Sequence, residues 1–266
     1  MNVSDVLTDL LAEQAALDPI VRGLAADDWA TPTASPRWTV TDQVAHLTYF
    51  DHTAAFAVSS PDRWDEEMQR LFGAAEGGDD GVDDLTLSPV RSLPPADRHG
   101  AWLVGRDALE QAAVGLADDA RVPWYGPSMG AKSFLTARLM ECWAHGQDIV
   151  DAVGAARPPS DRLRHIAQLG FITRGWTYAN RRAEMPEGEI QVRLGSPSGA
   201  VWTWGDDDAT STVTGDAEDF CLVVTQRRHL DDVSLDVRGE PALDWLLKAQ
   251  AFAGPPTDGP TAGSFR

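Results

Sequence analysis

Residues 38–47 read Trp-Thr-Val-Thr-Asp-Gln-Val-Ala-His-Leu, and this stretch predicts the start of a long helix. Thr39 stands at the N-cap position and Asp42 at N3, the arrangement of a capping box, in which each side chain bonds the other residue's backbone N–H. Apolar residues at helical spacing extend the expected helix over 40–58. His46 therefore lies in the middle of a helix, among apolar neighbours.

Further helices are predicted on both sides of this one. Apolar spacing, capping residues and a glycine stop place them at about 4–21, 96–116, 133–153 and 160–180. Residues 73–95 are rich in Gly, Asp and Pro, a composition typical of an exposed loop. The first part of the chain is therefore expected to be helical, with one long loop.

After Glu184 the pattern changes from helical spacing to short β-branched and aromatic segments separated by Gly, Ser and Asp, which predict strands. Helices are expected after Gly215 and at about 240–252. We therefore predict an α+β protein, with a helical bundle at 1–184 and a small α+β domain at 185–266.

Composition limits the classes of function. The 266 residues include 22 Lys and Arg against 41 Asp and Glu, a net charge of −19. Phosphate groups need basic partners, so neither nucleic acid nor an anionic membrane is expected to bind. No apolar stretch approaches the roughly 18 residues of a membrane span, and the acidic first residues do not resemble a signal peptide. With two cysteines and no disulfide framework, a cytoplasmic location is expected.

Glu141 and His145 carry the chemistry that the sequence offers most clearly. They stand four residues apart on the helix expected at 133–153, so their side chains share one face of that helix. A carboxylate and an imidazole in this arrangement can hold a divalent metal with a third ligand from another helix. His46 is the natural candidate for the third ligand.

The spacing alone does not establish a metal site. Asp161 and His165 repeat it at the start of the next expected helix, where an acid is favoured by the helix dipole. The apolar neighbours of Glu141 mean that an ionised carboxylate there needs a cation or hydrogen bonds. Arg138, one turn away, could meet that need as well as a metal.

Two motifs, taken together, resemble a known family. The first is Thr-Pro followed by Trp-Thr-Val, Asp, Val and His-Leu within 31–47, and the second is Glu-Cys-Trp-Ala-His-Gly-Gln-Asp at 141–148. The pair resembles the DinB-like metalloenzymes that include mycothiol-dependent maleylpyruvate isomerase. The ending Ala-Gln-Ala-Phe-Ala-Gly-Pro-Pro at 249–256 is similar to that of an actinobacterial metal-binding subgroup. The resemblance implies a four-helix bundle followed by a domain similar to sterol-carrier proteins.

Carried onto this sequence, the resemblance makes His46, Glu141 and His145 the ligands of a divalent metal. Zn²⁺ is expected, and Ni²⁺, Mn²⁺ or Fe²⁺ also suit nitrogen and oxygen ligands. Three protein ligands leave coordination positions open, as in a catalytic site. The resemblance further implies mycothiol as a cosubstrate activated by the metal, a small organic molecule as substrate, and a monomer or homodimer.

Four more residues are candidates for supporting roles. The isomerase of this family uses arginine in its C-terminal domain to hold a dicarboxylate, and Arg227 and Arg228 stand at about the right place. A solvent-facing basic helix end also explains these two arginines. Either Asp42 or Asp148 could accept the second ring N–H of a metal-binding histidine, although Asp42 also has the capping role.

Residues near the motifs complete the sequence-based hypotheses. Trp38, Trp124 and Trp143 are candidates for the wall of an aromatic pocket, and Cys142 is expected to be a buried structural cysteine rather than a nucleophile.

Three functions stay open: a thiol-dependent isomerase or S-transferase; a metal-dependent cyclase, lyase or hydrolase that uses no thiol; and a non-catalytic protein whose C-terminal domain binds an apolar ligand.

Overall fold

The computed structural model describes residues 1–265, which divide into two compact units. The first ends at Arg157 and the second begins at Pro158, whereas the sequence pattern placed the division after residue 184. The helices α8 (Leu163–Ile172) and α9 (Arg174–Arg181) therefore belong to the second unit. Gly170 of α8 lies so close to Val224 that an added Cβ would be 2.7 Å from the valine side chain, and this tight packing ties α8 to the C-terminal unit.

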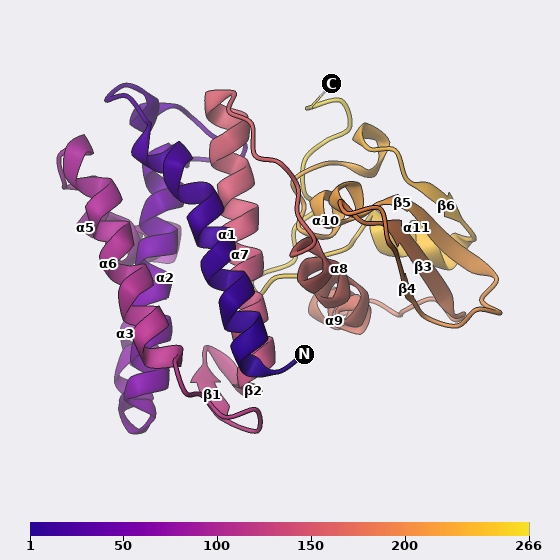
Figure 1. Ribbon diagram of the computed structural model, residues 1–266, viewed down its shortest axis with the longest axis horizontal. Coiled ribbons are helices and arrows are strands. Elements are labelled where there is room, and N and C mark those ends of the chain that lie inside the picture. Colours follow the sequence, from indigo (N-terminus) through magenta and orange to yellow (C-terminus); the bar gives the residue numbers. More distant parts are fainter. Residues whose placement is uncertain (266) are drawn as a thin grey trace. The chain divides into compact units, whose positions relative to one another are not determined.

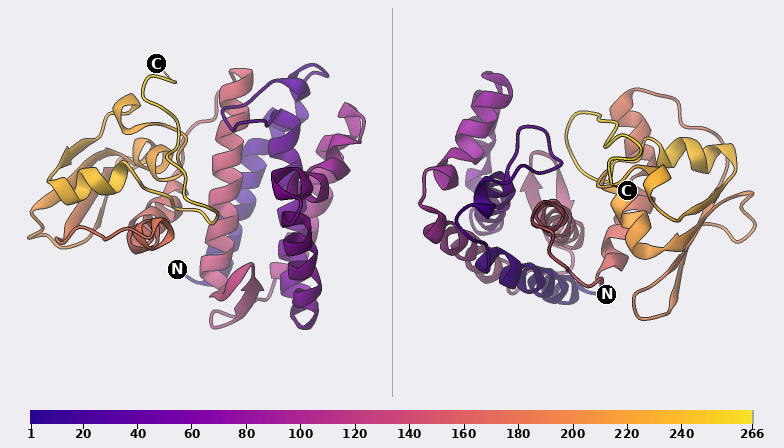
Figure 2. Two further views of the ribbon diagram at one scale, coloured as in Figure 1. Left: turned by 180° about the vertical axis from the view of Figure 1, so that it is seen from behind. Right: turned by 90° about the horizontal axis from the view of Figure 1, so that it is seen from above.

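Four long helices build the first unit, as the sequence predicts. They are α1 (Val3–Arg22), α2 (Val40–Ser59), α6 (Pro95–Ala113) and α7 (Ala131–Val153). In Figure 1 and the left panel of Figure 2 they lie side by side. Helices α1 and α2 each pack against both α6 and α7, the arrangement of a four-helix bundle. Their shared apolar core includes Leu17, Val44, Leu47, Trp102, Cys142 and Ile149.

The beginning of α2 is fixed by the capping box that the sequence indicates. The backbone N–H of Thr39 donates to Oδ2 of Asp42 at 2.7 Å, and its hydroxyl donates to the same oxygen at 2.9 Å. Helix α1 begins slightly earlier than the expected residue 4, because Asn2 is its N-cap, and it includes Pro19.

The prediction of an exposed loop over 73–95 was wrong. Three short helices fill most of residues 64–91: α3 (Trp64–Ala75), α4 (Gly78–Thr86) and α5 (Ser88–Arg91). Trp64 anchors this region, because its ring stacks on Trp124 with centroids 5.3 Å apart. Packing therefore stabilises helices in a segment whose Gly-, Asp- and Pro-rich composition suggested a loop. Such a composition is weak evidence for a loop where apolar residues recur at helical spacing.

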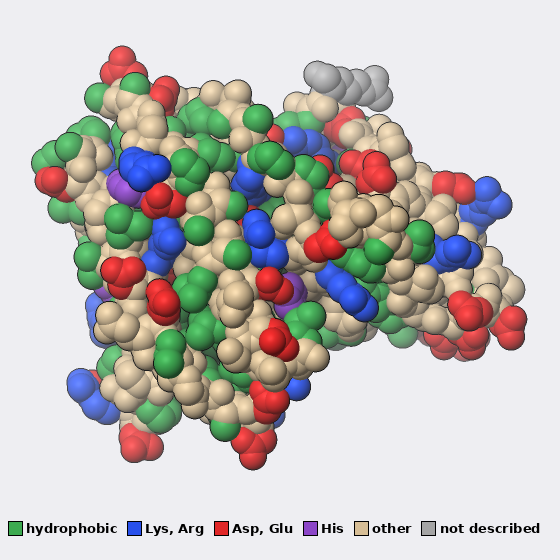
Figure 3. Space-filling view, in the orientation of Figure 1, with side chains coloured by type: hydrophobic (Ala, Val, Ile, Leu, Met, Phe, Trp, Pro, Cys, Tyr) green, Lys and Arg blue, Asp and Glu red, His purple; other side chains and the backbone are tan. Residues whose placement is uncertain are grey.

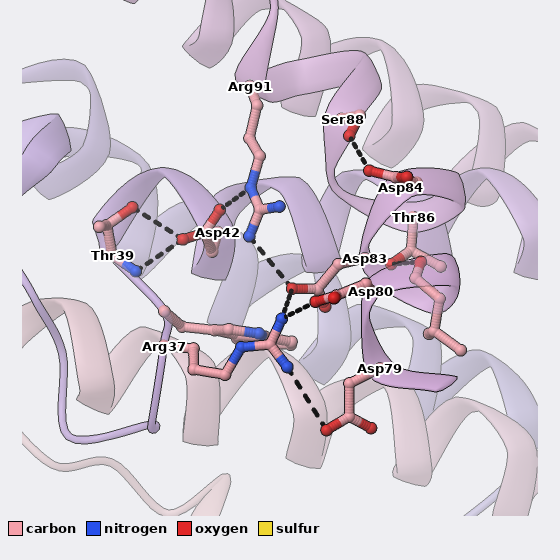
Figure 4. Close-up of polar contacts among 12 residues, drawn as sticks. Arg37, Thr39, Asp42, Asp79, Asp80, Asp83, Asp84, Thr86, Ser88 and Arg91 are labelled. Atoms are coloured by element: carbon pink, nitrogen blue, oxygen red, sulfur yellow. Dashed lines mark hydrogen bonds and ion pairs between the residues drawn. The ribbon is translucent and has the colours of Figure 1, made fainter. Parts of the chain in front are cut away.

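Ion pairs hold the acidic helix α4 beside the start of α2 (Figure 4). Arg91 donates from Nε to Oδ1 of Asp42 at 2.6 Å and from Nη2 to Oδ2 of Asp83 at 3.3 Å. Arg37, in the loop before α2, pairs with Asp79, Asp80 and Asp83. The acidic residues that suggested a solvated loop are thus partners of two arginines.

A short hairpin, which the sequence analysis missed, leads into α7. Strands β1 (Arg121–Trp124) and β2 (Gly126–Gly130) pair in antiparallel orientation. The hairpin packs against α2, α3 and α7. It places Trp124 and Tyr125 beside the middle of α2, where their rings contact Phe50.

The second unit contains a four-stranded mixed sheet, which confirms the predicted α+β domain. Its strand order is β4-β3-β5-β6, formed by β4 (Val201–Trp204), β3 (Ile190–Gly195), β5 (Ser211–Asp216) and β6 (Asp236–Arg238). Strand β3 runs antiparallel to β4 and parallel to β5, and β6 runs antiparallel to β5.

Helices α10 (Ala217–Val224) and α11 (Glu240–Leu246) pack against this sheet. Helix α11 ends earlier than residue 252, where the sequence placed its end. The segment after α11 is attached to the end of α10 instead, because the N–H of Ala251 donates to the carbonyl of Val224 at 2.9 Å. Within the described residues 1–265, three short 3₁₀ helices complete the elements, at Asp28–Ala30, Pro61–Arg63 and Leu230–Asp232.

Two further features of the structure concern the length of its apolar helices and the distribution of its acidic side chains. Within residues 1–265 there is no helix with the length and apolar character needed to cross a membrane. Asp and Glu side chains (red) are dispersed over the face drawn in Figure 3. The excess of acidic residues is therefore spread over this surface instead of gathering in one patch.

Candidate metal centre

Three side chains from two helices converge inside the bundle. Oε2 of Glu141 lies 3.0 Å from Nε2 of His145 and 3.2 Å from Nε2 of His46. All three residues offer a ligand atom within 4.8 Å of the others. Their side chains are 12–21% exposed, so the cluster is largely enclosed but can be reached from solvent. The structure thus brings together the three residues that the sequence analysis selected.

Two features of the sequence create this convergence. The spacing of four residues aligns Glu141 and His145 on one face of α7. The capping box starts α2 at a fixed residue, and apolar packing between α2 and α7 then sets which turn of α2 faces α7. His46 is therefore placed by the core of the bundle rather than by a local motif.

The ionisation of the cluster suits metal ligands. Burial lowers the pKa of His46 to about 4, helped by the charge of His145 and opposed by the hydrogen bond to Glu141. Burial raises the pKa of the Glu141 carboxyl, but its polar contacts with His145 and His46 outweigh this effect and bring that pKa well below its usual value. At neutral pH the cluster therefore offers a carboxylate and an uncharged His46 imidazole, the forms that bind metal.

Arg138 does not compensate the charge of Glu141, although its sequence position made it the alternative to a metal. Its guanidinium donates to Oδ1 of Asp51 at 3.1 Å, and both side chains are almost fully buried. Asp51 also accepts a hydrogen bond from Gln14 at 3.2 Å. Two imidazole nitrogens and one carboxylate oxygen are thus left facing one another, a donor set that fits a divalent metal of the zinc type.

Hydrogen bonds around His145 differ from those expected. Its Nδ1 lies 2.6 Å from Oε1 of Gln43, which the sequence analysis did not select, and 3.8 Å from Oδ2 of Asp148. The carboxylate of Asp42 bonds Thr39 and Arg91 instead of a site histidine. An amide therefore lies closer to Nδ1 of His145 than Asp148, which was a candidate for this contact. The sequence indicated Gln43 only weakly, through its position one turn before His46 on α2.

Aromatic rings border the cluster. The ring centroid of Trp38 lies 5.3 Å from that of His46 and 5.9 Å from that of His145. Phe50, one turn after His46, lies 4.5 Å from it, and Trp124 lies 6.3 Å from Phe50. Trp38 thus lies against both imidazoles, Phe50 lies against His46, and Trp124 packs on Phe50.

Trp143 and Cys142 have structural surroundings. Trp143 is buried and packs under the guanidinium of Arg157 at 5.4 Å. Burial raises the pKa of the Cys142 thiol, and nearby Glu13 acts in the same direction. A thiol that resists ionisation is a poor nucleophile, so its surroundings fit the expected structural role.

Arg227 and Arg228 follow α10 in the second unit. Nη1 of Arg227 donates to the carbonyl of Thr225 at 2.7 Å, and the guanidinium of Arg228 lies 3.9 Å from the ring centroid of Phe265. Both arginines therefore take part in the packing of their own unit.

A cavity of about 490 Å³ lies on a different side of α2. Its lining includes Tyr49, His52 and Glu67 but none of the three clustered ligands. The position of His52 agrees with its spacing of six residues from His46, which turns it away from the cluster. The three clustered ligands therefore lie outside this cavity.

Comparisons with known proteins identify relatives of the chain. The family model of the mycothiol maleylpyruvate isomerase N-terminal domain matches residues 10–150. Two uncharacterized proteins of Mycobacterium tuberculosis, from strains CDC 1551 / Oshkosh and ATCC 25618 / H37Rv, are each 42% identical over 253 residues, covering 95% of this chain and 97% of theirs.

Solved structures show the same fold. The crystal structure of the mycothiol-dependent maleylpyruvate isomerase matches with a TM-score of 0.59 and 16% identity, covering 91% of this chain and 94% of that one. The structure of a mutant of that enzyme matches with a TM-score of 0.57 at the same identity.

Proposed function

Because the chain belongs to the family defined by the mycothiol maleylpyruvate isomerase N-terminal domain, we propose that it is a thiol-dependent isomerase or S-transferase with a divalent metal at its centre. The observation that carries the proposal is the convergence of His46, Glu141 and His145 on one point between α2 and α7. A protein that only bound an apolar ligand would have no need of three such groups facing one another.

Zn²⁺ is the metal we propose for this site, and Ni²⁺, Mn²⁺ or Fe²⁺ would also suit the ligands. A bound divalent metal supplies a Lewis acid that lowers the pKa of a thiol and polarises a carbonyl group. Three protein ligands leave room for a small molecule beside it.

The surrounding residues prepare the site for this chemistry. Packing of Trp38 and Phe50 against the two imidazoles keeps water from the sides of the cluster, which strengthens electrostatic interactions within it. The same rings offer flat apolar surfaces, so we propose a small organic substrate with a planar, unsaturated part. Glu141 contributes the negative charge that draws a cation into this apolar environment.

Mycothiol is the proposed thiol, because the crystallised enzyme with the same fold is mycothiol-dependent. We retain Arg227 and Arg228 as proposed contacts for a carboxylate of the substrate. If either holds an anionic substrate, its replacement by alanine will raise KM for that substrate by roughly tenfold or more, as expected when a charge-assisted hydrogen bond is lost. Unchanged KM in both variants would rule this role out.

The decisive experiment combines metal analysis with a thiol screen. Protein loaded with Zn²⁺ is assayed with mycothiol and an unsaturated diacid, beside His46→Ala and the control His52→Ala. Turnover that needs both the thiol and His46, and survives in the control, supports the proposal. Metal binding with turnover that does not depend on any thiol would favour a cyclase, lyase or hydrolase. Failure of the wild type to bind metal would contradict the proposal.

A further inference from the structure

We propose that Gln43 is a positioning residue that keeps the ring hydrogen of His145 on Nδ1 and so directs Nε2 to the metal. The inference deepens the metal centre proposed above and rests on it. Gln43 lies on α2, is fully buried, and faces His145 of α7 across the bundle. Its amide makes three hydrogen bonds, and the direction of each one follows from the chemistry of its partners.

Two hydroxyl groups determine how the amide is turned. The hydroxyl of Thr33 donates to the carbonyl of Trp38 at 3.0 Å, and the hydroxyl of Ser35 donates to Oδ2 of Asp148 at 3.3 Å. A carbonyl and a carboxylate can only accept, so each hydroxyl has used its single hydrogen. Both hydroxyls lie near Nε2 of Gln43, at 2.9 and 3.0 Å, and they must accept from it.

The orientation of the amide then determines the state of His145. With its NH₂ group committed to the two hydroxyls, Gln43 presents Oε1 to Nδ1 of His145 at 2.6 Å. An amide oxygen carries no hydrogen, so Nδ1 must be the donor. This assignment follows from the hydrogen-bond network and does not require the hydrogens themselves to be seen.

The consequence appears at the other ring nitrogen. When a neutral imidazole carries its hydrogen on Nδ1, Nε2 holds a lone pair, and in His145 this lone pair faces Oε2 of Glu141 at 3.0 Å. Two acceptors at this distance repel each other, and a cation held by both atoms would remove that repulsion. With the hydrogen on Nε2, His145 would instead donate to Glu141 and could not be a ligand. Gln43 therefore selects the tautomer that binds metal.

The same amide ties the site to the loop before α2. Thr33 and Ser35 belong to this loop, which ends at Trp38, and the Trp38 ring lies 5.9 Å from that of His145. Asp148, at 3.8 Å from Nδ1, exceeds hydrogen-bonding distance and acts on the network through Ser35. Loss of the Gln43 amide would thus disturb both the ring hydrogen of His145 and the loop that carries Trp38.

Zn²⁺ affinity of the full-length protein, measured by competition with a chelator, tests this role. Gln43→Met keeps the length of the side chain but removes both the acceptor and the donors, and we expect affinity to fall by about 10- to 100-fold. Gln43→Glu keeps an acceptor for Nδ1, so it should recover part of the loss. Gln14→Met is the matched control, because Gln14 is equally buried in the bundle but bonds Asp51, and its Zn²⁺ affinity should match that of the wild type.

A second measurement separates this inference from the metal proposal. The ¹⁵N and ¹H NMR correlations of the histidine rings in metal-free wild type should place the hydrogen of neutral His145 on Nδ1, and this readout needs no substituted protein to fold. A hydrogen on Nε2, or unchanged Zn²⁺ affinity in Gln43→Met, would overturn the role of Gln43. A wild type with hydrogen on Nδ1 that binds no Zn²⁺ would support the tautomer assignment and contradict only the metal centre.

Discussion

Oε2 of Glu141 lies 3.0 Å from Nε2 of His145, one turn away on the same helix. The same oxygen lies 3.2 Å from Nε2 of His46 on the neighbouring helix, so a single carboxylate oxygen joins the two imidazoles. Because the two helices also share the apolar core of the bundle, the geometry of the cluster depends on how α2 packs against α7.

Removal of the carboxylate should abolish tight metal binding. Glu141→Gln keeps the shape of the side chain but removes its charge, and we expect the affinity for Zn²⁺ to fall at least 100-fold, measured by titration against a chelator. Asp161→Asn is the control, since Asp161 and His165 repeat the spacing of Glu141 and His145 in the second unit. Asp161 accepts the backbone N–H of Ser198, so this change should leave Zn²⁺ affinity as it is. Equal losses in both variants would count against a specific site.

The metal-free protein should lose stability as the pH falls below neutrality. His46 has a pKa of about 4 in the folded chain against a usual value of 6.5. The unfolded state therefore binds more protons between these values, and the free energy of unfolding decreases as pH falls from 6.5 toward 4, by about 3 kcal/mol from this residue. The lowered pKa of Glu141 acts in the same direction below its usual value of 4.5.

Urea unfolding in the presence of a chelator, at several pH values between 7.5 and 4.5, measures this loss. His46→Gln cannot titrate, so the decrease should be smaller in this variant than in the wild type. Identical pH dependence in the two proteins would show that His46 does not have a lowered pKa.

The buried pair of Arg138 and Asp51 should respond differently to single and double substitution. Asp51→Leu leaves the guanidinium of Arg138 buried without its partner, and we expect a loss of about 3–5 kcal/mol in the free energy of unfolding. Arg138→Met combined with Asp51→Leu should recover most of this loss. The exposed pair of Arg238 and Asp236 is the control, and its removal should cost about 1 kcal/mol or less. Additive effects at the buried pair would contradict the direct contact.

Trp38 should report metal binding. Its ring lies within 6 Å of both imidazole rings, so Co²⁺ or Ni²⁺ at the cluster should quench part of the tryptophan fluorescence. Trp38→Phe should lose a measurable share of this quenching. Trp176→Phe, which changes an exposed tryptophan of the second unit, should keep the quenching. Equal quenching in all three proteins would place the metal elsewhere.

Local sequence patterns predicted the parts of the site that depend on local geometry. The spacing of Glu141 and His145 and the capping box of Thr39 and Asp42 both follow from a single helix, and both are present as expected. The change of pattern near residue 185 predicted the α+β domain. The boundary itself differed, because α8 is assigned to the C-terminal unit by its packing on α10, which no local pattern reveals.

The features that escaped prediction depend on contacts between distant segments. The helices of 64–91 contain glycine and many acids, and they are held by Arg37, Arg91 and the stacking of Trp64 on Trp124. The role of Gln43 could not be inferred from the sequence, because it depends on a contact with His145 of α7. Asp42 was a candidate acceptor for the ring N–H of a site histidine, but its position on α2 directs its carboxylate to Thr39 and Arg91.

The metal content per chain, in the wild type and in His145→Ala, shows whether His46, Glu141 and His145 hold a metal ion. Both proteins are loaded with Zn²⁺, separated from excess metal by gel filtration, and analysed for zinc by elemental mass spectrometry. We expect about one equivalent of zinc in the wild type and almost none in the variant, with both proteins folded. A wild type without bound metal, or a variant that retains the full equivalent, would contradict the proposed metal centre.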